Sequence, residues 1–222
     1  MNHQLFFAIL FLVSYLFVIG FGEYVFRRYK LNSEYVRKVS HAVATLSSLL
    51  FLLAFQSYLY VLGLAVVFFV IFFLGRKFGI IRSLESVGRR TAGTYLLPVG
   101  IFFLFWFARY AGNELLYILP VLIVGISDPL AGYAGTAWQS RTRKISLLGY
   151  TFDKTLLGSS VFFLSAWMIS IWVLWFFHTT GKDLLIVSVL VAMVATLAEA
   201  VSEKGFDNLS VPLVVAGVLW WV

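Results

Sequence analysis

Long apolar runs, separated by short polar stretches, make up most of the chain. The runs cover roughly residues 4–22, 39–55, 57–75, 93–109, 114–135, 158–178, 183–199 and 208–222. Most approach the ~20 residues that an α-helix needs to cross the hydrocarbon core of a bilayer. A helix satisfies its own backbone hydrogen bonds, which lipid cannot do. The pattern therefore predicts an all-α, polytopic membrane helix bundle of about eight transmembrane helices.

Composition agrees with this class of protein. Of the 222 residues, 61% are hydrophobic and 12% are charged, whereas soluble domains are about half apolar and a quarter charged. The chain has no cysteine, which excludes disulfides, thiolate nucleophiles and cysteine-based zinc sites. The first run lacks preceding basic residues and a following small-residue cleavage site, so we expect a retained anchor over 4–22. We predict one membrane domain, 1–222, whose catalytic bundle spans about 37–222.

Basic residues are distributed very unevenly between the loops. If the eight runs all cross the membrane, fifteen of the 17 Lys and Arg residues lie on one side, and only Arg109 and Lys182 lie on the other. Short cytoplasmic loops carry the excess of Lys and Arg in membrane proteins. We therefore expect both termini outside the cell. The net charge of +7 then reflects topology and contacts with anionic lipid, with no nucleic-acid partner.

Polar side chains gather at the predicted cytoplasmic ends of the helices. Four segments hold them: "RKVSHA" (37–42), "SVGRRTAGTYLLPVGI" (86–101), the stretch from "SDPLAGYAG" to "DKTLLGSS" (127–160), and "EAVSEKGFDNLSVP" (199–212). Ionisable groups at membrane depth are expensive, and they usually face the interior of a bundle or a watery cavity. The four segments together predict one polar pocket at the cytoplasmic face.

The segment 127–160 contains two groups of residues that are candidates for a functional site. Ser127 or Asp128 could serve as the N-cap of a helix that Pro129 begins. Asp128 is a metal-ligand candidate only together with other carboxylates. Further on, "DKTLLGSS" combines Lys154 with hydroxyls and a glycine at the start of a predicted helix, an arrangement that favours anions. An ordinary loop with an anchoring lysine would show the same sequence features.

The last segment carries the most concentrated chemistry. Glu199, Glu203 and Asp207 recur every four residues, so the two glutamates share a helix face if 199–203 is a final helical turn. Gly205 would then end that helix and let Asp207 and Asn208 turn back toward the glutamates. Mg²⁺ takes one or two carboxylates together with substrate phosphates and water. The segment therefore predicts a magnesium–polyphosphate site.

These motifs, in this order, resemble the polyprenol kinase family, which includes dolichol, phytol and farnesol kinases and CTP-dependent diacylglycerol kinases. The resemblance extends from Arg37 to Pro212. It rests on "RKVSH", "GRRTAGTYLLPVGI", "DPLAGYAG", "KTLLGS" and "EAVSEKGFDNLSVP". The sequence departs from the family where Leu157 replaces a usual glutamate, and where "TAWQSRTRK" replaces a usual Gly-Lys.

The resemblance implies transfer of the γ-phosphoryl group of a nucleoside triphosphate, CTP or ATP, to a lipid alcohol, with Mg²⁺ as cofactor. It implies a multi-pass protein of a prokaryotic cell membrane, with its active site on the cytoplasmic side. We expect Asp128 and Asp207 to hold Mg²⁺. The other expected catalytic residues are Glu199, Asn208 and His41, the last as proton acceptor. The expected phosphate contacts are Arg37, Lys38, Arg90, Lys154, Thr155, Gly158 and Ser159.

Three other functions fit parts of the sequence. A phosphatidate cytidylyltransferase shares an Asp-x-x-Ala-Tyr stretch and a Lys-Thr-x-x-Gly-Ser stretch, although its terminal Pro-Gly-His-Gly-Gly signal is absent here. A CTP-dependent diacylglycerol kinase would use the same donor with another acceptor. A transporter would more naturally place its charges near the bilayer midplane in both halves of the chain.

Overall fold

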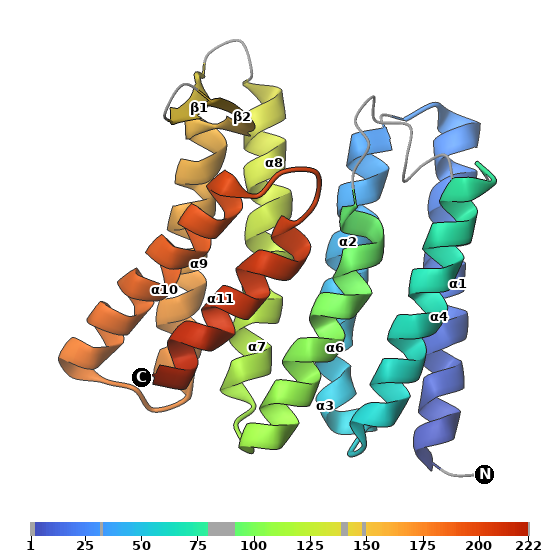
Figure 1. Ribbon diagram of the computed structural model, residues 1–222, viewed down its shortest axis with the longest axis horizontal. Coiled ribbons are helices and arrows are strands. Elements are labelled where there is room, and N and C mark those ends of the chain that lie inside the picture. Colours follow the sequence, from blue (N-terminus) through green and yellow to red (C-terminus); the bar gives the residue numbers. More distant parts are fainter. Residues whose placement is uncertain (1–2, 32, 80–91, 139–141, 148–149, 222) are drawn as a thin grey trace.

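The computed structural model is a bundle of helices with one small β-hairpin (Figure 1). It describes residues 3–31, 33–79, 92–138, 142–147 and 150–221. The helices are α1 (His3–Tyr29), α2 (Ser33–Ser47), α3 (Phe51–Ala54), α4 (Tyr58–Lys77), α6 (Gly93–Ala111), α7 (Leu115–Leu122), α8 (Asp128–Ala137), α9 (Leu156–Phe176), α10 (Gly181–Val201) and α11 (Asp207–Trp221). The strands are β1 (Lys144–Leu147) and β2 (Tyr150–Thr155).

The apolar runs form the predicted helices. Among the described residues, seven helical segments are long and apolar enough to cross a membrane, counting α2 with α3 and α7 with α8 as single segments. The eighth run forms α11, which has 15 residues and is too short to meet the same criterion. Both termini lie at one end of the bundle, and the hairpin lies at the other end (Figure 1).

The hairpin is the one departure from an all-α fold within the described residues. Strands β1 and β2 pair antiparallel, with Ser146 opposite Thr151 and an irregularity in register between Lys144 and Ser146. Two adjacent strands hold few residues, and the short alternation of "KISL" and "YTFDKT" is too weak to predict them. The hairpin leads directly into α9, and Thr155 caps that helix by accepting a hydrogen bond from the Gly158 amide (3.1 Å).

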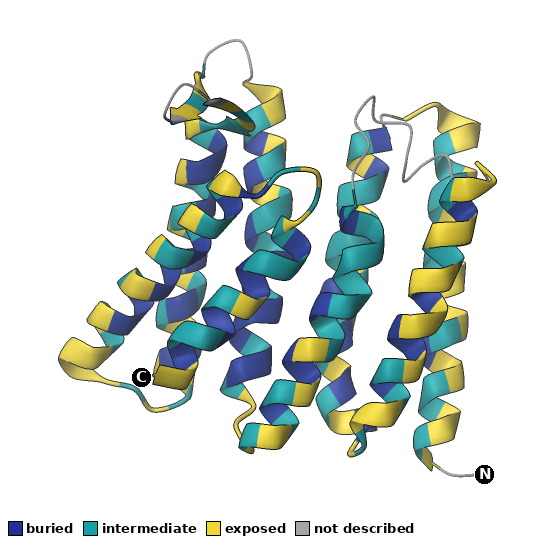
Figure 2. Ribbon diagram, in the orientation of Figure 1, coloured by how far each residue is buried: buried dark blue, intermediate teal, exposed yellow. Residues whose placement is uncertain are grey.

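Burial is greatest where α7, α9, α10 and α11 pack together (Figure 2). Leu119, Phe162, Val191 and Val215 are fully buried there. The N-terminal helix α1 has only one buried residue, Phe11, among those described. Its remaining apolar side chains are at least partly exposed, as expected for a peripheral helix that faces lipid.

The helix that carries Asp128 is continuous but locally widened. A π-helical turn, Ile123–Ser127, joins α7 to α8. Pro129 lacks the backbone N–H that a regular helix would pair with the Gly125 carbonyl, which favours a distortion one turn before the proline. The expectation of an N-cap was wrong: Ser127 has helical backbone angles and its side chain makes no capping hydrogen bond. Such π turns frequently occur at functional sites.

Candidate active site

A cavity of about 470 Å³ lies at the hairpin end of the bundle and extends between the helices. Its polar end is lined by the N-terminal part of α2, by α8, by the hairpin and by the segment that joins α10 to α11. Three of the four polar segments of the sequence therefore meet at one place. The fourth, 86–101, contributes Gly93, Thr94, Leu97, Pro98 and Ile101.

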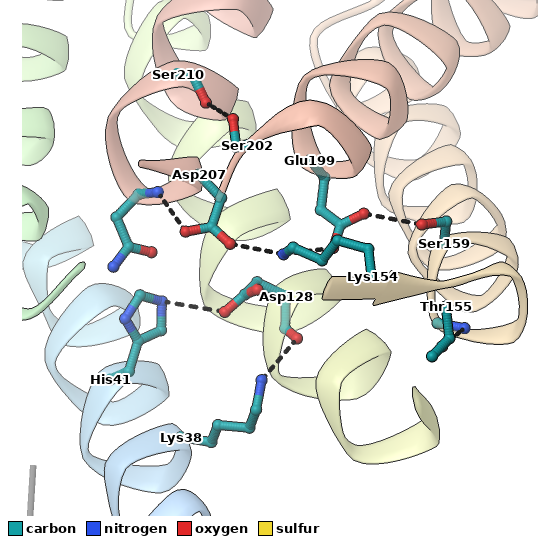
Figure 3. Close-up of polar contacts among 12 residues, drawn as sticks. Lys38, His41, Asp128, Lys154, Thr155, Ser159, Glu199, Ser202, Asp207 and Ser210 are labelled. Carbon is teal, nitrogen blue, oxygen red and sulfur yellow. Dashed lines mark hydrogen bonds and ion pairs between the residues drawn. The ribbon is translucent and has the colours of Figure 1, made fainter. Parts of the chain in front are cut away.

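Lys154, the penultimate residue of β2, lies at the centre of this polar end (Figure 3). Its Nζ atom is 2.6 Å from Glu199 Oε1 and 2.7 Å from Asp207 Oδ2. Burial alone would lower the pKa of the Lys154 ammonium, but the carboxylates of Asp207, Glu199 and Asp128 raise it above its ordinary value. Lys154 is therefore a permanent cation that joins α10 to α11 through their carboxylates.

Glu199 is held at the end of α10, facing the cavity. Its side chain is only 4% exposed, and its second oxygen, Oε2, accepts a hydrogen bond from Ser159 of α9 (3.0 Å). A buried carboxylate must be paired and hydrogen-bonded, and Lys154 and Ser159 together meet that need. Ser159 thus supports Glu199 in this structure; its predicted contact with phosphate stays a prediction.

The loop between α10 and α11 brings Asp207 back toward Glu199. Helix α10 ends at Val201, so Glu203 does not share a helix face with Glu199, and that expectation was wrong. Gly205 does not end the helix; it lies in the loop with φ +87°, where glycine is strongly favoured. The hydroxyls of Ser202 and Ser210 pair at 2.6 Å across the loop (Figure 3). The expected turn back toward the glutamate is therefore present, although by a different local structure.

Asn208 joins α11 to α6. Its side-chain amide donates to the Gly93 carbonyl (2.8 Å), and its backbone N–H is bonded to Asp207 Oδ1 (3.1 Å). A Cβ atom on Gly100 would lie 2.5 Å from the Asn208 carbonyl oxygen, so only glycine allows the two helices to approach this closely. The amide nitrogen of Asn208 is thus committed to positioning the start of α11.

His41 and Asp128 face each other across the cavity (Figure 3). His41 Nε2 lies 4.0 Å from Asp128 Oδ2, and it is buried without a hydrogen-bond partner among the described residues. The ring also hydrogen-bonds the backbone of Val124, in the π-helical turn. Because Nε2 is the unpaired nitrogen, this bond falls to Nδ1. Nε2 is left facing the cavity, as a proton acceptor would require.

Two basic residues of α2 lie beside this pair. Lys38 Nζ is 3.5 Å from the Asp128 backbone carbonyl and lies against Gly132, where a Cβ atom would overlap the ammonium group. The absence of a side chain at Gly132 therefore makes room for Lys38. Arg37 pairs with Glu34 at 3.2 Å on the same helix, and both residues line the cavity.

The predicted phosphate contacts at the start of α9 lie at a close helix crossing. A Cβ atom on Gly135 would be 2.9 Å from Thr155 Oγ1, and one on Gly158 would be 3.1 Å from the Ala131 carbonyl oxygen. The Thr155 hydroxyl is already used as the cap of α9. Thr155 and Gly158 thus have a structural role here, and their contact with phosphate stays a prediction.

The structure brings together all but one of the predicted site residues, and Arg90 lies outside the described residues. Sequence reasoning missed four contributors to the cavity. Gly132 leaves room for the Lys38 side chain, and Ser202 stabilises the loop before Asp207 by its hydrogen bond with Ser210. Lys144 and Asp153 of the hairpin pair at 3.3 Å and line the cavity. All four lie in the polar segments 127–160 and 199–212, which the sequence predicts to form one pocket, although none of them stands out by itself.

The residues present fit a bound Mg²⁺ ion. Asp128 and Asp207 line the same cavity, and Lys154 interacts electrostatically with both. Among the described residues no cluster of three or more His, Cys, Asp or Glu side chains is in position to hold a metal. Mg²⁺ is commonly held by one or two carboxylates, with water and substrate phosphates as the other ligands. Two carboxylates in one cavity would therefore be enough for a site that a polyphosphate completes.

Comparison with known proteins identifies a relative. The chain is 28% identical over 149 residues to phytol kinase of Synechocystis sp., a match that covers 66% of this chain and 61% of that protein. The matched part is thus less than two thirds of the relative's length. No protein-family model matches the chain, and no solved structure matches it. The chain is related to phytol kinase and resembles the polyprenol kinase family, as its motifs predict.

Proposed function

We propose that the protein is a lipid-alcohol kinase, which transfers the γ-phosphoryl group of CTP or ATP to an isoprenoid alcohol in the membrane. The observation that carries this proposal is the cavity itself. One end gathers Lys38, His41, Asp128, Lys154 and Asp207, and the rest is lined by apolar side chains between membrane helices. A phosphate donor from water and an acceptor from lipid can meet in such a cavity. The similarity to phytol kinase supports the same reaction.

The donor binds at the basic part of the cavity, on the cytoplasmic side. Lys38, Arg37 and Lys154 line that part, and charge-assisted bonds from Lys and Arg to phosphate are the strong ones. The hairpin pair Lys144 and Asp153 borders the same space. Further candidates for phosphate contacts are Arg90, Thr155, Gly158 and Ser159. Because Lys154 already neutralises two carboxylates, an incoming phosphate exchanges one partner of Lys154 for another.

Mg²⁺ would be held by Asp128 and Asp207, where it would neutralise the charge that develops on the donor phosphates. Phosphoryl transfer needs little covalent chemistry from the protein, so positioning and charge neutralisation provide most of the catalysis. Glu199 keeps Lys154 in place, and Asn208 fixes the first turn of α11 against Gly93. Both residues therefore orient the groups that contact the substrate.

His41 accepts the proton of the acceptor's hydroxyl group. Its Nε2 atom has no hydrogen-bond partner among the described residues, and His41 lines the cavity between its polar and apolar parts. Asp128, 4.0 Å away, stabilises the imidazolium that forms. The deprotonated alcohol oxygen then attacks the γ-phosphorus, the bond to the leaving diphosphate breaks, and the phosphate monoester forms.

A label-transfer assay with purified protein tests the reaction. CTP and ATP, each labelled at the α or the γ position, are combined with isoprenoid alcohols, diacylglycerol and phosphatidate. We expect γ-label on an alcohol, and loss of transfer in Asp207→Asn, which removes a ligand charge with little change in volume. Transfer of α-label to phosphatidate would identify a cytidylyltransferase instead, and γ-label on diacylglycerol alone would identify the diacylglycerol kinase alternative.

The proposed base is tested with a matched pair of histidines. His41→Asn should lower kcat by about 10²–10⁴-fold with little change in the KM for the donor. His178→Asn is the control, because His178 is an exposed residue just after α9, far from the cavity lining, with a φ of +64° that asparagine tolerates well. Equal kcat values for the two variants would exclude His41 as the base.

A further inference from the structure

The cavity continues beyond the polar site as an apolar arm between α1, α2, α4 and α6. Residues of all four helices line it, together with Phe51 of α3. The arm is defined here by Tyr15, Val18, Ile19, Ala44, Phe51, Val61, Leu64, Ala65, Phe68, Phe72, Leu97 and Ile101. Within the described residues, nothing in the proposed transfer of phosphate uses this part of the cavity.

Helix α4 presents one continuous face to the arm. The residues of this face have the spacing of a single helical stripe: Val61, Leu64, Ala65, Phe68 and Phe72. From Val61 to Phe72 the stripe extends about 16 Å along the helix axis. Val61, Leu64, Ala65 and Phe68 are each at most 7% exposed. The adjacent Val66 is 53% exposed, so the opposite face of α4 is turned to lipid.

The arm is closed at the end distant from the polar site. Phe51 and Val61 line it there and are 3% and 1% exposed. Arg109 of α6 donates to the carbonyls of Leu52 and Phe55 (2.6 and 2.7 Å), which fixes the turn after α3 over this end. The other end opens toward His41 and Asp128. A molecule in the arm therefore has its buried tip near Val61 and its free end at the catalytic groups.

These features specify the chemistry of the occupant. A closed apolar cavity stays dry and binds apolar molecules. The junction with the polar site favours a polar group at one end, which is the hydroxyl group in the proposed reaction. The whole cavity measures about 470 Å³, toward the lower end of the ~300–1,000 Å³ usual for small-molecule sites. The donor phosphates must share that volume, so an acceptor with a single hydrocarbon chain fits better than one with two.

We propose, on the basis of the proposed kinase function, that the arm holds the single hydrocarbon chain of the acceptor alcohol, and that Ala65 and Val61 set the chain length. Ala65 is the smallest of the α4 residues on the stripe, and it lies between Phe68 and Val61. A chain that starts at His41 must pass Ala65 to reach Val61. A larger side chain at position 65 closes the arm halfway, and a smaller one at position 61 extends it.

The test compares Ala65→Phe with Val66→Phe, which places the same bulk on the lipid-facing side of α4. Linear primary alcohols of increasing length are assayed with full-length protein for kcat/KM, and for Kd without donor by displacement of a radiolabelled alcohol. Each value for a variant is divided by the wild-type value for the same alcohol, so that partitioning of the alcohol into detergent cancels. For Ala65→Phe we expect a ratio near one with short chains and a loss of at least about tenfold once the chain passes position 65. Val66→Phe should stay near one at every length.

Val61→Ala should have the opposite effect and move the length optimum upward, which keeps the test valid even if Ala65→Phe fails to fold. A ratio for Ala65→Phe that is independent of chain length, with an unchanged optimum in Val61→Ala, would overturn the assignment of the arm. Length-dependent Kd values without any transfer of γ-label would retain the chain site and refute the kinase proposal. Transfer of γ-label without any effect of chain length would support the kinase proposal and refute the chain site.

Discussion

Lys154 is the residue on which the polar end of the cavity depends most. It belongs to the hairpin, yet its ammonium group contacts a carboxylate of α10 and a carboxylate of α11. Without it, the Ser159 hydroxyl would be the remaining partner of Glu199 among the described residues. Two carboxylates close together would then repel each other in a site of low dielectric constant. One cation thus determines both the charge and the geometry of the proposed donor site.

Removing that cation should destabilise the protein. Lys154→Met leaves a buried charge uncompensated, which costs about 3–5 kcal/mol in comparable buried pairs. Lys144→Met is the matched control, since its partner Asp153 is half exposed and such surface pairs contribute about 0–1 kcal/mol. Thermal unfolding in detergent should show a large fall in Tm for Lys154→Met only. Adding Glu199→Gln should recover part of the loss, and equal Tm values for the two lysine variants would contradict this account.

The pH dependence of this contribution follows from the raised pKa of Lys154. Its pKa in the folded protein lies above the ordinary value of 10.5. The unfolded chain therefore releases this proton first, and the ion pairs stabilise fully below about 10.5, losing their effect as the pH rises through the folded value. The difference in Tm between wild type and Lys154→Met should stay constant from neutral pH to about 10. A difference that changes with pH within this range would contradict the raised pKa of Lys154.

At the scale of elements, the contact between α6 and α11 tests how α11 is positioned. Gly100→Ala would place a Cβ atom 2.5 Å from the Asn208 carbonyl oxygen, so one helix must move and the bond from Asn208 to Gly93 must stretch. We expect a lower Tm and a large loss of kcat. Gly63→Ala, in the second turn of α4, meets nothing within 4 Å and should be neutral or stabilise by up to about 1 kcal/mol. Equal behaviour of the two variants would show that the helices tolerate separation.

Elements differ in how far the sequence predicts them, and the reason is the length of the signal. The run that forms α4 has 20 residues of almost unbroken apolar character, which only a buried or lipid-facing helix can explain. The hairpin has two strands of four and six residues, too few to rise above chance alternation. Pro129 is a local signal near the π-helical turn at Ile123–Ser127, but the close packing of Gly125 against Leu46 is a tertiary contact with no local signature.

The same distinction applies to the site. The polar segment that carries Glu199, Glu203 and Asp207 at intervals of four, with Gly205 before Asp207, was sufficient to expect that Asp207 turns back toward Glu199. The sequence also placed Lys154 near a polyphosphate site. It could not show that Lys154 lies between the two carboxylates, because that contact joins residues 53 positions apart. Nor could it show the apolar arm, since its Phe, Leu and Val residues resemble those that face lipid.

At the scale of the whole molecule, packing is uneven in a way that suits the proposed reaction. The C-terminal helices enclose a continuous core, whereas α1 and the outer faces of α4 and α6 remain exposed (Figure 2). The cavity lies between these two regions, with polar groups at the hairpin end and apolar groups toward the other. A rigid core thus carries Glu199 and Asp207, and the more loosely packed helices surround the proposed chain site.

The orientation of the bundle in the membrane is the remaining prediction. The basic asymmetry of the loops predicts that the hairpin end faces the cytoplasm and that both termini face out. Because the chain has no cysteine, single cysteines can be introduced at the exposed residues Ser146, Thr180 and His3. In right-side-out vesicles, an impermeant maleimide should label Thr180→Cys and His3→Cys, and Ser146→Cys should react only after permeabilisation. Labelling of Ser146→Cys from outside would place the donor site on the wrong side for a cytoplasmic nucleotide. Opposite sides for His3→Cys and Thr180→Cys would mean that one of the apolar segments from α1 to α9 does not cross the membrane.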